Sequence, residues 1–143
     1  MLNARFSQAS LRLRYLFANL CDLAPCAAIH VFVIHDQPAV IVERLLTQSP
    51  RIVSFGVYIW NLHETRRVIG ILKKIALHIH VVIGGPEVTH EHHEEPIIAL
   101  TDVLITGEAD LTFRQVCVYL LTGTPVPKVV DSSKPDVTAL VLP

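Results

Sequence analysis

The stretch Val81-Val-Ile-Gly-Gly-Pro-Glu-Val88 decides the expected fold class, because an apolar run ends there in two adjacent glycines. Its counterpart, Ile52-Val-Ser-Phe-Gly-Val-Tyr-Ile-Trp60, is a second apolar run that carries a glycine. Apolar runs of this length, rich in β-branched residues, are typical of strands buried on both faces of a parallel sheet. Glycines at a strand end remove Cβ atoms and permit positive φ, so a backbone can lie flat against a large ligand. The glycine pair therefore has two interpretations, a tight turn and the floor of a ligand site.

Strands and helices are expected to alternate along the chain. Pro38 suits the first turn of a helix, where a missing N–H costs nothing. Asn61 and Glu64 predict a capping box at a helix start, and Gly123 predicts a helix end. The apolar spacing predicts helices over 10–20, 38–48, 61–76, 94–100 and 109–122, and strands over 28–34, 51–58, 80–83 and 102–105.

This alternation predicts one α/β domain with a mainly parallel sheet, right-handed crossovers and helices on both faces. The domain is expected to span residues 1–123, with a first strand truncated to Met1-Leu2. Residues 124–143 are punctuated by prolines and are expected to form a tail or linker, or an edge strand.

The composition excludes several classes of function. Hydrophobic residues make up 51% and charged residues 17% of the 143 residues, and the mean hydropathy is +0.46. Charges or histidines interrupt every apolar run before the roughly 18 residues of a membrane span, and we recognise no secretory signal. The net charge of −1 offers no argument for nucleic acid. Cys21, Cys26 and Cys117 lack CxxC spacing and are expected to be buried thiols of a reducing, cytoplasmic compartment.

Four segments at the predicted carboxyl ends of strands, where ligands bind such sheets, carry a family resemblance. They are Leu2-Asn-Ala-Arg-Phe-Ser-Gln-Ala-Ser10, Ser54-Phe-Gly-Val-Tyr-Ile-Trp-Asn61, Gly84-Gly-Pro-Glu87 and Thr106-Gly-Glu108. Together they resemble the N-terminal cobalamin-binding domain of B12-binding radical SAM proteins, over nearly the whole chain to about Gly123.

The resemblance implies a flavodoxin-like Rossmann three-layer sandwich with a corrin ring over the carboxyl ends of the strands. It also implies that the Gly84-Gly85 turn lies along the dimethylbenzimidazole tail of cobalamin, and that Gly107-Glu108 lies at the mouth of the site. Gly56 would take the position where related domains often carry serine. The expected cofactor-binding residues are Asn3, Arg5, Ser7, Gly56, Tyr58, Trp60, Asn61, Gly84, Gly85, Pro86, Glu87, Gly107 and Glu108.

Two departures from the family pattern limit the expected chemistry. Corrinoid domains often carry an Asp-x-His-x-x-Gly loop after the first strand, whose histidine coordinates cobalt; here Arg5 stands where that histidine would be. A guanidinium stays protonated and does not ligate metals, so no protein histidine is expected on the cobalt. The chain also lacks the CxxxCxxC motif of the radical SAM half. The iron–sulfur cluster and S-adenosylmethionine are therefore expected only in a separate domain of the parent protein.

A histidine-rich loop offers a rival signal. Thr89-His-Glu-His-His-Glu-Glu95 carries imidazoles and carboxylates that bind zinc or nickel in other settings. Adjacent histidines diverge on a helix, and we find no distant residue to complete a ligand set. The loop is expected to be a solvated approach to a short helix, with no metal.

Two strand-end features have a structural as well as a functional interpretation. Tyr58 and Trp60 either stack on a ligand ring or close one end of the core. Glu108 lies either at the mouth of a pocket or at a helix N-terminus, where the macrodipole favours its charge.

Other functions find no support in the residues. No nucleophile, base and orienting group can be assembled, and no P-loop is present. A receiver domain would need an aspartate after its third strand, where Gly56-Val-Tyr58 stands instead. The preferred function is a corrinoid-binding module that serves the radical SAM domain of its parent chain, without nucleic-acid or membrane partners. The alternative is a flavodoxin-like interaction module without cofactor.

The truncated first strand suggests how the chain assembles. In the flavodoxin-like order 2-1-3-4-5 the first strand lies between residues 28–34 and 51–58. An empty position there would leave unpaired backbone groups that invite another strand. Either Lys128-Val-Val130 or Val137-Thr-Ala-Leu-Val-Leu142 is expected to fill the gap or to pair with an edge, within one chain or in a homodimer.

Overall fold

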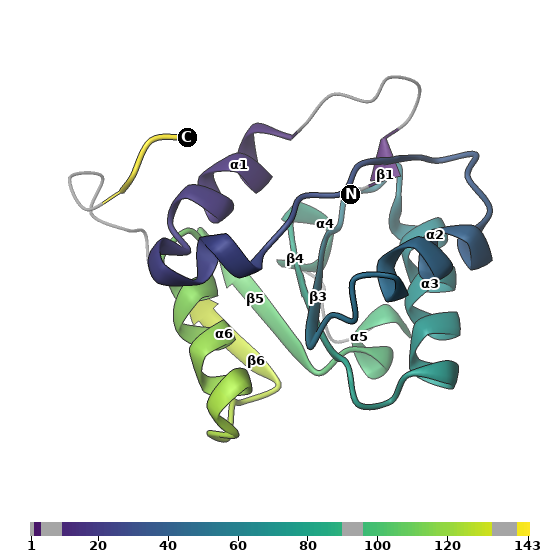
Figure 1. The fold of residues 1–143 in the computed structure, drawn as a ribbon. Coiled ribbons are helices and arrows are strands. Elements are labelled where there is room, and N and C mark those ends of the chain that lie inside the picture. Colours follow the sequence, from purple (N-terminus) through teal and green to yellow (C-terminus); the bar gives the residue numbers. More distant parts are fainter. Residues whose placement is uncertain (1, 4–9, 90–95, 133–139) are drawn as a thin grey trace.

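The centre of the molecule is a parallel sheet of four strands in the order β3-β4-β5-β6. The computed structural model describes residues 2–3, 10–89, 96–132 and 140–143. The strands are β3 (Ile52–Gly56), β4 (His80–Gly84), β5 (Val103–Gly107) and β6 (Val129–Ser132), and all three pairings are parallel. Their carboxyl ends meet at one edge of the sheet (Figure 1). The predicted α/β class is confirmed.

Two short strands form a separate parallel pair, β1 (Leu2–Asn3) with β2 (Phe32–Val33). The predicted strand over 28–34 is therefore too long. The physical reason is that a ladder forms only where two backbones run side by side, and β1 offers two residues as a partner. The truncation of the first strand is confirmed, and among the described residues β3 has a strand neighbour on its β4 side alone.

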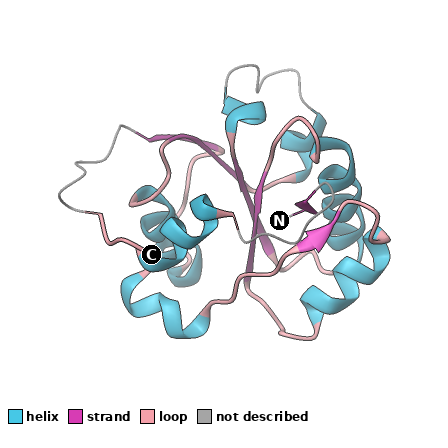
Figure 2. Ribbon diagram, turned by 90° about the horizontal axis from the view of Figure 1, so that it is seen from above, coloured by secondary structure: helices cyan, strands magenta, loops and turns pink. Residues whose placement is uncertain are grey.

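Helices cover both faces of the sheet and give the flavodoxin-like three-layer arrangement (Figures 1 and 2). One face carries α2 (Pro38–Leu46), α3 (Leu62–Ile75), α4 (Pro86–Thr89) and α5 (Pro96–Leu100). The other face carries α1 (Leu11–Ala18), the 3-10 helix η1 (Cys21–Cys26) and α6 (Thr112–Thr122). None of the helices in the described part of the chain combines the length and the hydropathy that crossing a membrane requires.

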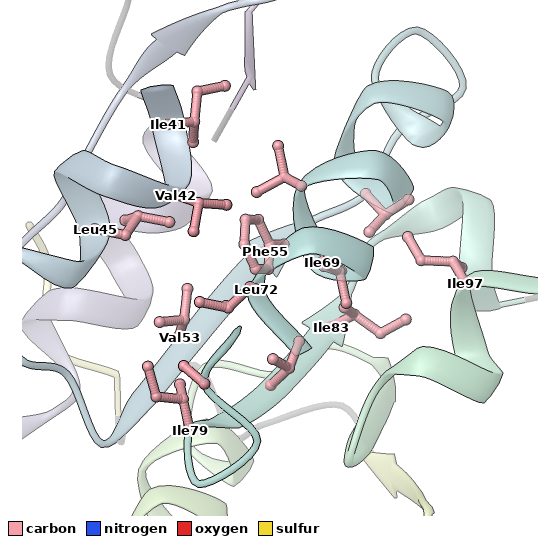
Figure 3. Close-up of a cluster of buried hydrophobic side chains, with 14 of the residues drawn as sticks. Ile41, Val42, Leu45, Val53, Phe55, Ile69, Leu72, Ile79, Ile83 and Ile97 are labelled. Atoms are coloured by element: carbon pink, nitrogen blue, oxygen red, sulfur yellow. The ribbon is translucent and has the colours of Figure 1, made fainter. Parts of the chain in front are cut away.

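The main core lies between the sheet and the face of α2 and α3 (Figure 3). Val53, Phe55 and Val57 alternate along the β3 strand and its continuation toward this face, and all three are buried. On α3, Ile69 and Leu72 are 0% exposed. Truncation of either residue to alanine removes packed methyl groups and costs about 2–5 kcal/mol. This core fixes the position of the strand ends.

The helix ends confirm some predictions and correct others. Gly123 ends α6 in the left-handed region with φ of 74°, as predicted. The capping box is wrong, because Asn61 makes no side-chain cap hydrogen bond to α3 and Glu64 pairs with Arg67 over 3.0 Å. The short α4 was not predicted.

The cysteine prediction also needs correction. Cys117 is buried, but Cys21 and Cys26 are exposed free thiols. Cys21 and Cys26 are the first and last residues of η1, a surface segment that contains no buried residue. Neither side chain therefore packs into a core.

The tail supplies the last strand of the sheet. Lys128 leads into β6, which pairs in parallel with β5, for example Val130 with Ile105. Residues 124–143 were expected to form a tail, a linker or an edge strand, and Val129–Ser132 form an edge strand within the same chain. Residues 137–139 of the second β-prone run lie outside the described residues, and Leu140–Leu142 form no strand.

Candidate functional site

A cavity of about 320 Å³ lies at the carboxyl ends of β3, β4 and β5, between the sheet and α1. We call it the strand-end cavity. It is lined mainly by apolar surface and by residues from five parts of the chain. They are Ser10, Arg12, Leu13, Tyr15, Leu16, Ser54, Phe55, Gly56, Tyr58, Val82, Ile83, Gly84, Gly85, Ile105, Gly107, Glu108, Ala109, Asp110, Phe113 and Leu140.

Small residues make the floor of this cavity. Ser54 and Gly56 share one face of β3, and Gly84 lies beside Gly56 on β4. A Cβ on Gly56 would meet Tyr58 Cε2 at 3.5 Å, an ordinary contact, whereas one on Gly84 would lie 3.2 Å from the carbonyl oxygen of Ile105. The α2–α3 face of β3 carries large side chains instead, so small residues on the opposite face leave the hollow.

Gly85 has a different reason to be glycine. Its φ is 128°, and a Cβ there would lie 2.2 Å from the carbonyl oxygen of Val57. The Val57 N–H donates to the Gly84 carbonyl oxygen over 2.7 Å. The two backbones therefore touch, and the tight-turn interpretation accounts for Gly85, while Gly84 belongs to the cavity floor.

Asn61 holds the loop after β3 in place. Its side chain is buried at 0% exposure. The Asn61 Nδ2 donates to the Gly56 carbonyl oxygen over 3.1 Å, and Oδ1 accepts from the Tyr58 N–H over 2.9 Å. Asn61 does not line the cavity but positions Gly56 and Tyr58, which do. Its side chain is thus engaged with this loop rather than with the start of α3.

Tyr58 and Trp60 stack on each other, with ring centroids 4.6 Å apart and an interplanar angle of 11°. Tyr58 lines the strand-end cavity. Trp60 is 48% exposed and does not line the cavity. The stacked pair thus extends from the cavity wall to the protein surface.

The Gly107-Glu108 loop is fastened by the end of β6. Gly107 has φ of 76°, and a Cβ on it would lie 2.4 Å from the Ser132 carbonyl oxygen. The Ser132 hydroxyl donates to the Glu108 carbonyl oxygen over 2.6 Å. Glu108 lines the cavity, and the first turn of α6 contains no acidic residue. The mouth-of-pocket interpretation of Glu108 therefore fits, because α6 begins at Thr112 rather than at Ala109.

Charged groups gather beside the apolar floor. Arg12, Glu108 and Asp110 all line the cavity. Burial, followed by the charge of Glu108, raises the pKa of Asp110 above its ordinary value. Asp110 therefore holds its proton more readily than an exposed aspartate does.

The structure brings six of the expected site residues to the cavity: Gly56, Tyr58, Gly84, Gly85, Gly107 and Glu108. Trp60, Asn61, Pro86 and Glu87 lie next to it without lining it, and Asn3 lies in β1. Arg5 and Ser7 lie outside the described residues. The residues of α1 and Leu140 were not predicted as site residues; the helical apolar spacing of Leu13 and Leu16 indicated only a core face.

Among the described residues, the metal-ligand types in this cavity are limited to the carboxylates of Glu108 and Asp110. Its lining includes no histidine or cysteine among the described residues. The described residues contain no group of three or more His, Cys, Asp or Glu side chains able to hold a metal ion. The histidine-rich loop, 90–95, lies outside the described residues, so its expected lack of a metal stays a prediction.

The fold and the cavity together define a doubly wound α/β domain with a candidate ligand site at the carboxyl ends of its strands. The family model of the B12 binding domain matches residues 17–117. The chain therefore belongs to the B12-binding domain family, and this membership supports cobalamin binding.

Structural comparison agrees on the fold. The N-terminal domain of the hypothetical protein TM0182 from Thermotoga maritima is similar, with a TM-score of 0.54 and 17% sequence identity. The match covers 89% of this chain and 97% of that one. No curated protein matches the chain.

The cavity fits one part of a cobalamin. Ligand pockets enclose about 300–1,000 Å³, and the strand-end cavity, at about 320 Å³, lies at the lower end of that range. It is large enough for a flat, largely apolar group such as the dimethylbenzimidazole base of the nucleotide tail. The corrin ring would have to lie outside, over the strand ends.

Proposed function

We propose that this chain is a corrinoid-binding module, with the nucleotide tail of cobalamin in the strand-end cavity and the corrin ring over the carboxyl ends of the strands. The observation that carries the proposal is the hollow above Ser54, Gly56 and Gly84 in a chain of the B12-binding domain family. A planar aromatic base fits between this floor and the apolar side of α1.

The remaining expected residues take supporting roles in this proposal. Tyr58 offers a ring edge or face to the tail, and Gly107 and Glu108 border the cavity mouth. Asn61 acts through the loop that it holds, since its amide binds the backbone at both Gly56 and Tyr58.

We further propose that cobalt carries no protein histidine. The resemblance of the sequence puts Arg5 where the family's histidine ligand would stand, and the described lining of the cavity contains no histidine; both favour this proposal. A bound corrinoid would supply a cobalt centre for alkyl-group chemistry.

The partner in this proposal is a radical SAM domain of the same parent chain, which would hold the iron–sulfur cluster and S-adenosylmethionine. The setting is cytoplasmic, and a homodimer is part of the proposal because β3 has an open side among the described strands. The chain alone is expected to be inactive, so incubation with S-adenosylmethionine, iron, sulfide and reductant should yield no 5′-deoxyadenosine above a protein-free control.

The test is retention of hydroxocobalamin by the purified chain through gel filtration, read from its visible spectrum. Trp60 is the single tryptophan, so quenching of its emission by the corrin gives a dissociation constant. Gly56→Val should fold, because its Cβ has only an ordinary contact with Tyr58, and should lose retention because it fills the floor.

Gly70→Ala is the matched control for this variant. Gly70 lies in α3, on the opposite face of the sheet, and a Cβ there would lie 4.0 Å from Leu100 Cδ1. It should retain cobalamin like the unaltered chain. If the unaltered chain retains no corrinoid, the alternative function, a flavodoxin-like interaction module without cofactor, takes the place of this proposal.

A further inference from the structure

The C-terminal segment 140–143 lies against α1, far in sequence from the sheet residues of the site (Figure 1). The contact is made by Asn19, the residue that follows α1 and is 1% exposed. Asn19 Nδ2 donates to the Val141 carbonyl oxygen over 3.0 Å, and Asn19 Oδ1 accepts from the Val141 N–H over 2.9 Å. A buried amide thus pairs with both backbone groups of one residue.

This pairing depends on backbone and not on side-chain identity. Val141 is 49% exposed and Leu142 is 75% exposed, so their side chains add little. Leu140, the neighbour of the paired residue, lines the strand-end cavity together with Leu13 and Leu16 of α1. The segment therefore contributes part of the cavity wall while Asn19 holds its backbone.

Helix α1 needs such an attachment. It has no buried residue, although it forms the roof of the strand-end cavity. A second hollow of about 570 Å³ separates α1 and η1 from β3 and α6, and Leu13 and Leu16 line both hollows. Beyond α1, η1 is tied to α6 by Asp22, which accepts from Arg114 Nη2 over 2.6 Å and from Nε over 3.1 Å. Helix α1 is thus loosely packed, and the α1–η1 segment is held by the hydrogen bonds of Asn19 to Val141 and of Asp22 to Arg114.

We propose that Leu140–Pro143 is a strap that fastens α1 over the strand-end cavity, and that release of this strap controls how fast a ligand enters and leaves. Asn19 is the positioning residue that holds the strap, and Leu140 is the residue that closes the cavity. Both lie outside the residues expected from the sequence, and the strap lies beyond the family match, which ends at residue 117. The identity of the ligand, a corrinoid, rests on the proposed function; the strap itself does not.

The first test needs no cofactor. Cys117 is 6% exposed and lines the second hollow together with Leu13 and Leu16 of α1, so movement of α1 away from the sheet should expose it to a thiol reagent. Val141→Pro removes the backbone N–H that donates a hydrogen bond to Asn19 Oδ1. Val141→Ala is the matched control because it keeps that N–H. We expect Cys117, located by peptide mass spectrometry, to be modified about tenfold faster in Val141→Pro than in Val141→Ala, the effect of roughly one hydrogen bond.

A chain truncated after residue 139 removes the strap and leaves Asn19 intact, and its Cys117 should react at least as fast as in Val141→Pro, because both hydrogen bonds to Val141 are lost. Equal Cys117 rates in Val141→Pro, Val141→Ala and the truncated chain would overturn the proposal. Amide exchange adds a direct check, since the Val141 N–H of the unaltered chain should exchange more slowly than the N–H of exposed Leu142. Equal exchange at these two positions would likewise overturn it.

The second test uses hydroxocobalamin as the probe. Pre-bound corrinoid should dissociate about tenfold faster from Val141→Pro than from Val141→Ala, and association should also be faster, because the change opens the cavity rather than altering its floor. Equal release from the two variants would overturn control by the strap. If the unaltered chain binds no corrinoid, that result counts against the proposed function, while the Cys117 rates still decide whether the strap holds α1.

Discussion

A Cβ atom on Gly85 would stand 2.2 Å from the carbonyl oxygen of Val57, closer than any real contact of a Cβ with oxygen. Gly85 also has φ of 128°, a conformation that side-chain-bearing residues rarely adopt. Gly85→Ala is therefore expected to lower the free energy of unfolding by about 2 kcal/mol or more, with or without cobalamin. Urea denaturation followed by circular dichroism measures this change.

Gly123→Ala separates the cost of the close contact with Val57 from the cost of a positive φ. Gly123 also has positive φ, at 74°, but nothing lies within 4 Å of a Cβ built there. It should lose only the roughly 1 kcal/mol of left-handed backbone strain. If Gly85→Ala is no more destabilising than Gly123→Ala, the contact between residues 57 and 85 does not restrict position 85. The same contact means that a loss of cobalamin in a Gly85 variant would report a folding defect.

Asn61→Ala is expected to destabilise the loop that borders the cavity. It removes the hydrogen bonds to the Gly56 carbonyl oxygen and from the Tyr58 N–H, at a cost of about 2–4 kcal/mol for two buried bonds. The measurement is thermal unfolding together with the emission of Trp60, which stacks on Tyr58. His63→Ala is the control, since the His63 side chain is 70% exposed and its loss should change neither signal.

The fold was predictable where local pattern and tertiary packing agree. The strands at 51–58, 80–83 and 102–105 were found because β-branched residues buried on both faces leave an unmistakable apolar run. The helix that begins at Pro38 followed from amphipathic spacing and a start signal. Gly123 marked the end of α6 because only glycine readily takes the left-handed conformation that stops a helix.

The misjudged elements depend on partners that a local pattern does not contain. Residues 28–31 look like a strand, but a strand also needs a neighbour, and β1 pairs only with Phe32–Val33. Asn61 reads as a cap, yet its amide finds the loop backbone after β3 instead. The edge strand at Val129–Ser132 was one of the alternatives for the tail, and only its pairing with β5 decides between them.

The site was predictable to the extent that strand ends converge. Gly56, Gly84 and Glu108 were placed near one another because parallel strands end on one edge of a sheet, and all three line the cavity. The sequence did not predict Leu140 as a site residue, because nothing in a proline-rich tail shows which helix the tail will contact.

The stability of the protein should depend on Asp110 in acid. Burial, then Glu108, raises its pKa above the ordinary 3.8. Because the folded state holds this proton to higher pH than the unfolded state does, its stabilising effect is full below pH 3.8 and is lost as the pH rises through the raised pKa. Asp110→Asn should therefore raise Tm at neutral pH, and the gain should shrink in acid.

Glu108→Gln is the control for this titration. Glu108→Gln removes the negative charge that helps to raise the pKa of Asp110, but it leaves Asp110 buried. It should therefore raise Tm at neutral pH by less than Asp110→Asn does. A gain from Asp110→Asn that is the same at neutral and at acid pH would show that charge at this position is not the origin of the effect.

The cobalt environment gives the last prediction. If the proposed corrinoid binds over the strand ends, cob(II)alamin in this chain should show no coupling to a protein nitrogen. The described cavity lining contains no histidine, and by the sequence resemblance Arg5 would take the family's ligand position with a guanidinium that does not ligate. The measurement compares electron paramagnetic resonance spectra of natural-abundance protein and protein uniformly labelled with the heavy nitrogen isotope. Identical spectra are expected, because any remaining nitrogen splitting would arise from the unlabelled cofactor. A splitting that changes with the label would identify a protein imidazole on the cobalt, and with it a ligand from elsewhere in the chain.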